Sequence, residues 1–265
     1  MTTRTRIPAA APAWVRSVLA GPDRPARVVH RGSDAVYVDV DGSCLGALST
    51  AATAVPCAVR TGLPELPPRL LVAEHATVGG GRLALGDTDL VVTRTVAADV
   101  PRLGAAEVLG TSRRLTAAVA DRAEHVRAEL PGVALETLVA GRAEAVPALL
   151  GRGSGLTPLG DDVLAGWVAT VVAVNGPSDD APVVDAVARH APAMTTLLSA
   201  TLLDCARRGD VIPQFRTLLL ALAGPDQRAI DDAVDALLKV GHTSGAGLTL
   251  GAVLALRHLA SRSHT

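Results

Sequence analysis

The stretch that decides the fold class lies at residues 105–130, which read AAEVLGTSRRLTAAVADRAEHVRAEL. Apolar residues recur in it every three or four positions, the spacing that places them on one face of a helix. The region before it, residues 26–96, instead has short β-branched runs in which apolar and polar residues alternate. Turn sequences such as DGS (41–43) and GGGR (79–82) separate these runs and are typical of hairpin tips. Strands therefore precede helices along this chain.

These two sequence patterns predict an α+β fold with two regions. Residues 1–100 are expected to form a strand-rich N-terminal region, as a small barrel or sandwich, and residues 101–265 a C-terminal helical bundle. Helices are expected at 104–130, 135–150, 158–174, 181–190, 194–208, 212–223, 226–240 and 246–261.

The composition argues against several classes of protein. Hydrophobic residues make up 49% of the 265 residues, which predicts an extensive buried core. Aromatic residues are only 2%, so few rings are present to stack on nucleobases. The 25 basic and 26 acidic residues leave a net charge of -1, and the arginines are scattered without a dense cluster. We therefore expect no nucleic-acid partner.

The N-terminus and the apolar runs predict a cytoplasmic protein without a membrane span. The longest apolar stretch, residues 163–174, is shorter than the roughly 20 residues that cross a bilayer. Arg16 interrupts the best candidate for a signal peptide. The cysteines, Cys44, Cys57 and Cys205, lack CxxC or zinc-finger spacing. They are interpreted as buried reduced thiols, with a reactive nucleophile as the alternative.

Two adjacent aspartates open one of the most apolar runs in the chain, in GRGSGLTPLGDDVLAGW at residues 151–167. We predict Thr157 as the N-cap and Pro158 as the first helical residue, which puts Asp161 and Asp162 in the first turn. An acidic residue in the first turn of a helix interacts favourably with the helix dipole, by about 0.3–1 kcal/mol. This would explain a single exposed aspartate. This helix is apolar on nearly every side, so its start is expected to be buried. Two carboxylates there indicate a functional site rather than simple capping.

The glycine-rich loop before the aspartates predicts a site for a small anion. It lacks the GK[ST] of a P-loop, the GxGxxG of a dinucleotide fold and the GxSxG of a hydrolase. Unpaired backbone N–H groups at the helix start would favour negative charge. The residues expected to line the site here are Arg152, Gly153, Ser154, Gly155, Thr157 and Gly160. Aspartates beside an anion require a metal ion or separate subsites; if a metal is present, Asp161 and Asp162 would be its ligands and Mg²⁺ is the candidate ion.

A second loop, GHTSGAG at residues 241–247, also leads into an apolar helix. His242 is the histidine best placed to carry a proton, and Thr243, Ser244 and Gly245 follow it as candidate ligand contacts. The alternative is a plain turn in which Thr243 or Ser244 caps the helix. Sequence alone leaves both interpretations open.

The third element is APAMTTLLSATLLDCARRGD at residues 191–210. Thr195 and Ser199 are four residues apart and so share one helical face, and Thr196 lies beside them. These hydroxyls either line a polar pocket or bond back to their own helix.

Taken together and in this order, the GLTPxGDD loop, the TT…S helix and the GH[ST]SG loop resemble the AllH family, named after a subunit associated with oxamate carbamoyltransferase in allantoin breakdown. The matching positions are Gly155, Leu156, Thr157, Pro158, Gly160, Asp161, Asp162, Thr195, Thr196, Ser199, Gly241, His242, Ser244 and Gly245. The chain departs from the family pattern at Leu159 and at Gly247, where relatives commonly carry an aspartate.

The resemblance implies transfer of a carbamoyl group between carbamoyl phosphate and oxamate, with oxalurate as the other reactant. It also implies partner subunits and hence an oligomer. On this hypothesis the loop amides hold phosphate or carboxylate, Asp161 or Asp162 handles a proton or a metal, and His242 polarises or protonates the substrate. The competing hypothesis is a non-catalytic module that binds a small carboxylate or ureide, and a third holds that the aspartates are structural.

Overall fold

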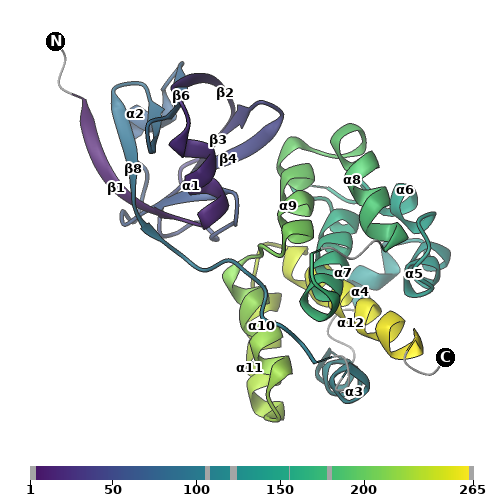
Figure 1. Ribbon diagram of the computed structural model, residues 1–265. Coiled ribbons are helices and arrows are strands. Elements are labelled where there is room, and N and C mark those ends of the chain that lie inside the picture. The colour runs from purple at the N-terminus through teal and green to yellow at the C-terminus, as the bar shows by residue number, and fades with distance from the viewer. Residues whose placement is uncertain (1–3, 105–107, 120–123, 155, 178–180, 263–265) are drawn as a thin grey trace. The chain divides into compact units, whose positions relative to one another are not determined.

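The computed structural model describes residues 4–104, 108–119, 124–154, 156–177 and 181–262. The chain divides into two compact units, Met1–Ala98 and Asp99–Thr265. The first is a closed β-barrel with two short helices, and the second is built from helices (Figure 1). The predicted α+β fold, with a strand-rich N-terminal region before a helical bundle, is confirmed.

The barrel follows from short alternating runs that pair with their neighbours. Its elements are β1 Thr5–Ala11, α1 Ala13–Ala20, β2 Arg24–Arg31, β3 Ala35–Val40, β4 Ser43–Leu48, β5 Ala58–Thr61, α2 Pro68–Leu71, β6 Ala76–Gly79, β7 Arg82–Leu85 and β8 Thr88–Thr95. The strands close in the order β1-β5-β4-β3-β2-β6-β7-β8. A parallel pairing of β1 with β8 completes the ring. Both predicted hairpin tips are confirmed, because DGS joins β3 to β4 and GGGR joins β6 to β7.

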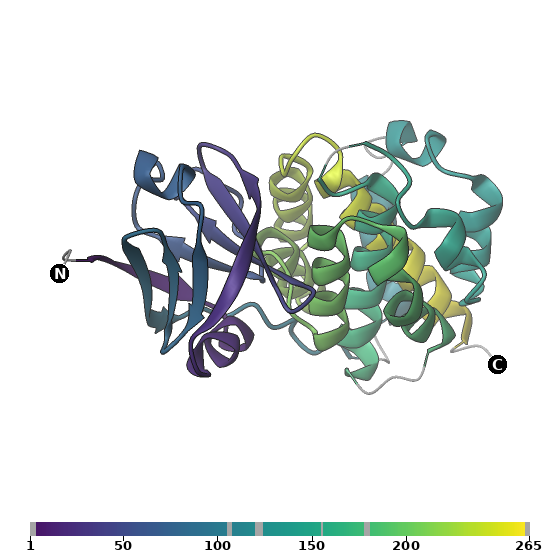
Figure 2. The same cartoon turned by 90° about the horizontal axis from the view of Figure 1, so that it is seen from above.

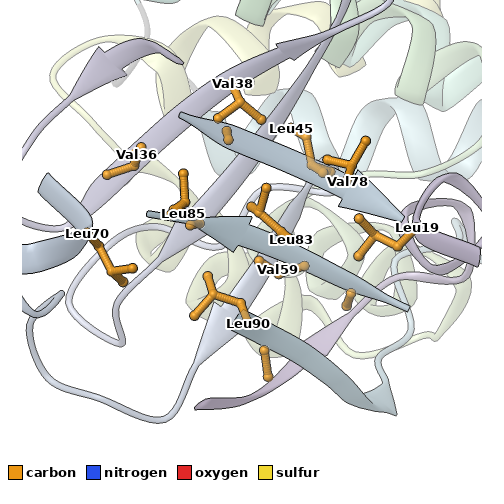
Figure 3. Packing of buried hydrophobic residues seen from close by; sticks show 14 of the residues in the cluster. Leu19, Val36, Val38, Leu45, Val59, Leu70, Val78, Leu83, Leu85 and Leu90 are labelled. Carbon is orange, nitrogen blue, oxygen red and sulfur yellow. The ribbon is translucent and has the colours of Figure 1, made fainter. Parts of the chain in front are cut away.

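Aliphatic side chains fill the barrel, as the scarcity of aromatic residues predicts (Figure 3). Val38, Leu45 and Val78 come from the strands and are almost fully buried. Leu19 of α1 and Leu70 of α2 enter the same cluster from opposite sides of the view in Figure 3. Each such side chain stabilises the folded unit by about 1.5–3 kcal/mol through removal from water. The two helices thus close the core that the strands surround.

The helical unit contains α3 Val108–Val119, α4 Glu124–Ala128, α5 Gly132–Val139, α6 Ala145–Leu149, α7 Leu159–Asn175, α8 Pro182–Met194, α9 Leu197–Arg208, α10 Pro213–Ala223, α11 Gln227–Leu238 and α12 Ser244–Arg262. The prediction of a single helix at 135–150 is wrong, because two separate helices, α5 and α6, occupy this range. Gly141 lies between them with φ +69°, and a side chain there would collide with the ring of His258. Of the helix expected at 104–130, residues 105–107 and 120–123 lie outside the described residues.

Helix α7 is the central element of this unit, and α12 packs along it (Figure 2). Every residue of α7 from Leu159 to Ala173 is buried. The two backbones approach closely, since a Cβ atom on Gly166 would collide with the carbonyl oxygen of Leu248. A Cβ on Gly251 would likewise collide with the carbonyl oxygen of Val163. Among the described residues, no helix combines the length and apolar character that crossing a membrane requires.

Candidate functional site

The start of α7 is buried, as predicted, because the preceding loop folds back over it. The amide of Gly160 donates to the carbonyl of Arg152 at 2.9 Å. Gly160 itself fits against α6, since a Cβ there would collide with the carbonyl oxygen of Leu149. The amides of Asp161 and Asp162 donate to the carbonyl of Pro158 at 3.0 and 3.2 Å. The expectation of unpaired amides at this helix start is therefore wrong for these three residues.

Asp161 ties two loops to the first turn of α7. Its side chain, on a residue only 2% exposed, accepts the backbone N–H of Gly151 at Oδ1 over 2.8 Å. Its other oxygen, Oδ2, accepts the hydroxyl of Thr195. Burial raises the pKa of Asp161, and the hydrogen bonds from Thr195 and Gly151, together with the nearby hydroxyl of Ser199, oppose that rise by favouring the charged form. Both oxygens of this carboxyl group are thus engaged by the protein itself.

Asp162 has a different environment although it is the next residue. It is 6% exposed, and its Oδ2 is buried without a hydrogen-bond partner. Burial raises the pKa of Asp162 to about 8, and the neighbouring charge of Asp161 adds to the rise. The hydroxyls of Ser244 and Thr157 act against it. Asp162 therefore favours the protonated form at neutral pH, in which the carboxyl group is a hydrogen-bond donor.

A contact between two hydroxyls joins the α7 loop to the start of α12. Thr157 Oγ1 lies 2.9 Å from Ser244 Oγ. The prediction that Thr157 caps α7 is wrong: the N-cap is Pro158 and no side chain caps this helix, because the Thr157 hydroxyl bonds across to α12 instead. Both side chains are half-buried, so the site reaches the surface here.

Helix α9 brings the third group of predicted residues to the same place. Thr196 is its N-cap and accepts the amide of Ser199 at 3.1 Å, while its hydroxyl donates to the carbonyl of Leu156 at 2.7 Å. Ser199 is 2% exposed, and its Oγ has no hydrogen-bond partner of good geometry. It lies close enough to Asp161 to lower the pKa of that carboxyl group. These hydroxyls thus face α7 rather than only their own helix.

Other predicted site residues lie around this centre without reaching the aspartates. Arg152 is exposed, and its Nε donates to the carbonyl of Ala148 at 3.1 Å. Gly153, Ser154 and His242 are exposed, and Thr243 is half-buried. Gly155 lies outside the described residues. A Cβ on Gly245 would collide with the carbonyl oxygen of Leu237, which gives this glycine a packing role. Ligand contacts by these residues stay predictions.

Gly247, where the chain departs from the family pattern, lies directly against the start of α7. A Cβ atom at this position would lie 2.8 Å from Cβ of Asp162 and 3.2 Å from the carbonyl oxygen of Leu159. A side chain at this position would not fit against α7 without a shift of one helix. Gly247 and Gly251 are four apart and share one face of α12, the sequence signal for a close helix contact.

The donor set does not fit the expected Mg²⁺ ion. Mg²⁺ needs a near-octahedral set of oxygen ligands. Asp161 already uses one oxygen for a hydrogen bond from Gly151 and the other for one from Thr195. Within the described part of the chain, no group of three or more histidine, cysteine, aspartate or glutamate side chains is placed to hold a metal.

The three loops thus lie together: hydrogen bonds join the start of α7 and the loop before it to the N-terminal ends of α9 and α12. A comparison with protein families matches residues 149–256 to the oxamate carbamoyltransferase subunit AllH. This segment is AllH-like. The match covers less than half of the chain but includes all three loops, so the resemblance drawn from them is confirmed. No curated protein and no solved structure gives a significant match.

Proposed function

We propose that this chain acts as an AllH-type subunit of a cytoplasmic oxamate carbamoyltransferase, with its substrate site at the buried aspartate pair. The observation that carries the proposal is the meeting of the three family motifs at one place. Thr157 contacts Ser244, and Thr195 contacts Asp161, although these residues are far apart in the sequence. Packing alone does not require so many polar groups around a buried helix start.

The proposed reaction belongs to allantoin breakdown and has only small anions as reactants. The amide nitrogen of oxamate attacks the carbonyl carbon of carbamoyl phosphate. The bond from that carbon to the phosphate oxygen breaks, phosphate leaves, and the nitrogen gives up one proton as oxalurate forms. In the reverse direction phosphate attacks oxalurate and releases oxamate. A site for these compounds needs hydrogen-bond donors and little stacking surface.

The site residues divide into two proposed roles. Asp161 is a positioning residue, because it holds Gly151 and Thr195 in place. Asp162 and the hydroxyl of Ser244 contact the substrate. His242 remains the predicted proton carrier: it is exposed, two residues before Ser244 on the loop that leads into α12. The exposed Arg152 and the half-buried Thr196 are proposed contacts for the charged end of the substrate.

A second candidate function is a non-catalytic module that binds the same anions or helps to assemble the complex. One observation favours it. Neither aspartate is a free general base at neutral pH, because Asp161 is engaged at both oxygens and Asp162 favours its protonated form. On this reading the partner subunits supply the groups that react.

The test is phosphate-dependent cleavage of oxalurate by the purified chain, first alone and then with the partner subunits of the complex. Oxamate and carbamoyl phosphate are measured as products. Asp162→Ala should abolish turnover, while Asp185→Ala, an exposed acid in the first turn of α8, should not. Circular dichroism verifies that each variant is folded. Full turnover by Asp162→Ala contradicts the proposed site. Binding of oxalurate without turnover in any combination favours the second candidate.

A further inference from the structure

The only asparagine of the chain is followed directly by a glycine. Asn175 is the last residue of α7, and Gly176 is the residue that caps the end of this helix. Asparagine is one of the thermally labile residues of proteins. The backbone nitrogen of the next residue can attack its side-chain amide carbon, and a glycine leaves this nitrogen unobstructed because it has no Cβ atom. The other side-chain amides, those of Gln214 and Gln227, would have to close a larger and less favourable ring.

The structure exposes the asparagine but holds the attacking nitrogen in a hydrogen bond. Asn175 is exposed. The amide of Gly176 donates to the carbonyl of Val172 at 2.8 Å, which closes the last turn of α7. With φ +97° at Gly176, the chain leaves the helix directly after this bond. Because the ends of helices open more readily than their centres, this turn is a place where the nitrogen becomes available to react.

The guanidinium group of Arg102 lies against this turn. A Cβ atom on Gly176 would lie 2.8 Å from one terminal nitrogen of Arg102 and 3.0 Å from the other. The segment that carries Arg102 is itself fixed to α7, since the amide of Leu103 donates to the carbonyl of Ala173 at 2.9 Å. Gly176 is buried although its neighbour Asn175 is exposed, so the arginine helps to cover the closed turn. Its positive charge also suits the C-terminal end of a helix.

We propose that Asn175 is a site of spontaneous deamidation and that the last turn of α7, covered by Arg102, controls the reaction. When the bond from Gly176 to Val172 opens, the Gly176 nitrogen gives up its proton to water and attacks Cγ of Asn175. The bond from Cγ to the side-chain nitrogen breaks, ammonia leaves, and a cyclic succinimide forms. Water then opens this ring at either carbonyl carbon, so that residue 175 becomes aspartate or isoaspartate. The product places a new carboxylate near the guanidinium of Arg102.

The test compares deamidation with hydrogen exchange in the full chain at pH 8 and 37 °C. Peptide mass mapping follows the change from amide to acid at residue 175, and an isoaspartyl methyltransferase detects isoaspartate. The same incubation in concentrated guanidinium gives the rate for the unfolded chain. Both reactions need the open turn, so folding should slow deamidation by the factor by which it protects the N–H of Gly176 from exchange. Gln214 and Gln227 should stay unchanged.

Arg102→Gln uncovers the turn and should raise the rates of exchange at Gly176 and of deamidation at Asn175 by the same factor. Arg69→Gln, at an exposed arginine of α2, is the matched control and should change neither rate. The inference is overturned if the folded chain deamidates as fast as the unfolded one, or yields no product in a time at which the measured protection predicts it. An effect of Arg102→Gln on only one of the two rates, or on neither, also overturns it.

Discussion

Oδ1 of Asp161 lies 2.8 Å from the backbone nitrogen of Gly151 and anchors the glycine-rich loop to the first turn of α7. Through its other oxygen the same side chain holds Thr195, at the entry to α9. One carboxylate thus fixes two loops relative to the helix that carries Asp162. The two adjacent aspartates thus differ: Asp161 is hydrogen-bonded within the protein at both oxygens, whereas Oδ2 of Asp162 is buried without a hydrogen-bond partner of good geometry.

Asp161→Ala should therefore lower the stability of the helical unit substantially. The two hydrogen bonds to this group contribute about 1.5–3 kcal/mol each, and the cost of burying the carboxylate offsets part of that gain, so we expect the free energy of unfolding to fall by about 2–4 kcal/mol. The control is Asp185→Ala, which removes an exposed first-turn acid of α8 and should cost less than about 1 kcal/mol. Urea unfolding of both variants measures the difference. Equal losses would mean that Asp161 serves only the helix dipole.

Gly247→Ala should destabilise the packing of α12 on α7. The new Cβ would lie 2.8 Å from Cβ of Asp162, and relief requires a shift of one helix. Overpacking of this kind costs about 1–3 kcal/mol. Gly132→Ala is the matched control, because a Cβ at this first residue of α5 meets nothing within 4 Å. Thermal unfolding compares the two, and an unchanged melting temperature for Gly247→Ala would contradict the close approach.

The stability of the chain should fall with rising pH through the titration of Asp162. An unfolded aspartate loses its proton near pH 4, whereas burial raises the pKa of Asp162 to about 8 in the folded chain. The folded state thus binds the proton of Asp162 more tightly than the unfolded state does. The stabilisation that this gives is complete below about pH 4. Between about pH 4 and pH 8 it is lost, by at most ~1.4 kcal/mol per pH unit.

Asp162→Asn removes this contribution and should flatten the pH dependence. Burial also raises the pKa of Asp161 and of Asp210, so some slope of the same sign should persist in the variant. Urea unfolding at intervals between pH 5 and 8 gives both slopes. Parallel curves for the wild type and Asp162→Asn would show that Asp162 titrates as an ordinary aspartate.

The cysteines should be unreactive while the chain is folded. Cys44, Cys57 and Cys205 are buried, and burial raises the pKa of Cys44 and of Cys205 to about 12. Since the thiolate is the reacting form, a chromogenic disulfide reagent at pH 8 should label none of them in the native chain. All three should react in concentrated guanidinium. Rapid labelling of a cysteine in the native chain would instead support the alternative interpretation, a reactive nucleophilic cysteine.

The fold could be predicted where local pattern and tertiary packing agree. Helix α7 begins and ends within one residue of the expected 158–174, because its apolar run is continuous. The expected helix at 135–150 breaks instead, since the contact between Gly141 and His258 of α12 involves a residue more than a hundred positions away. Local periodicity carries no information about such a partner.

The sequence singles out Asp161, Thr195, Thr157 and Ser244, which the structure brings together in pairs, but it does not predict which residue contacts which. Asp161 and Asp162 are identical residues in one turn, and only the fold gives one of them Gly151 and Thr195 and leaves the other with an unpaired oxygen. Thr157 has the sequence features of an N-cap, yet its partner is Ser244, 87 residues away. These assignments depend on tertiary contacts, which sequence spacing does not encode.

The most direct measurement of the central claim is the ionisation of the two aspartates in the folded chain. Carboxyl carbons labelled with ¹³C on aspartate are followed by NMR from pH 3 to 9, with Asp161→Asn and Asp162→Asn used for assignment. We expect a midpoint near pH 8 for Asp162 and, for Asp161, a midpoint above that of an ordinary aspartate. A midpoint for Asp162 near the ordinary value of about 3.9 would contradict it.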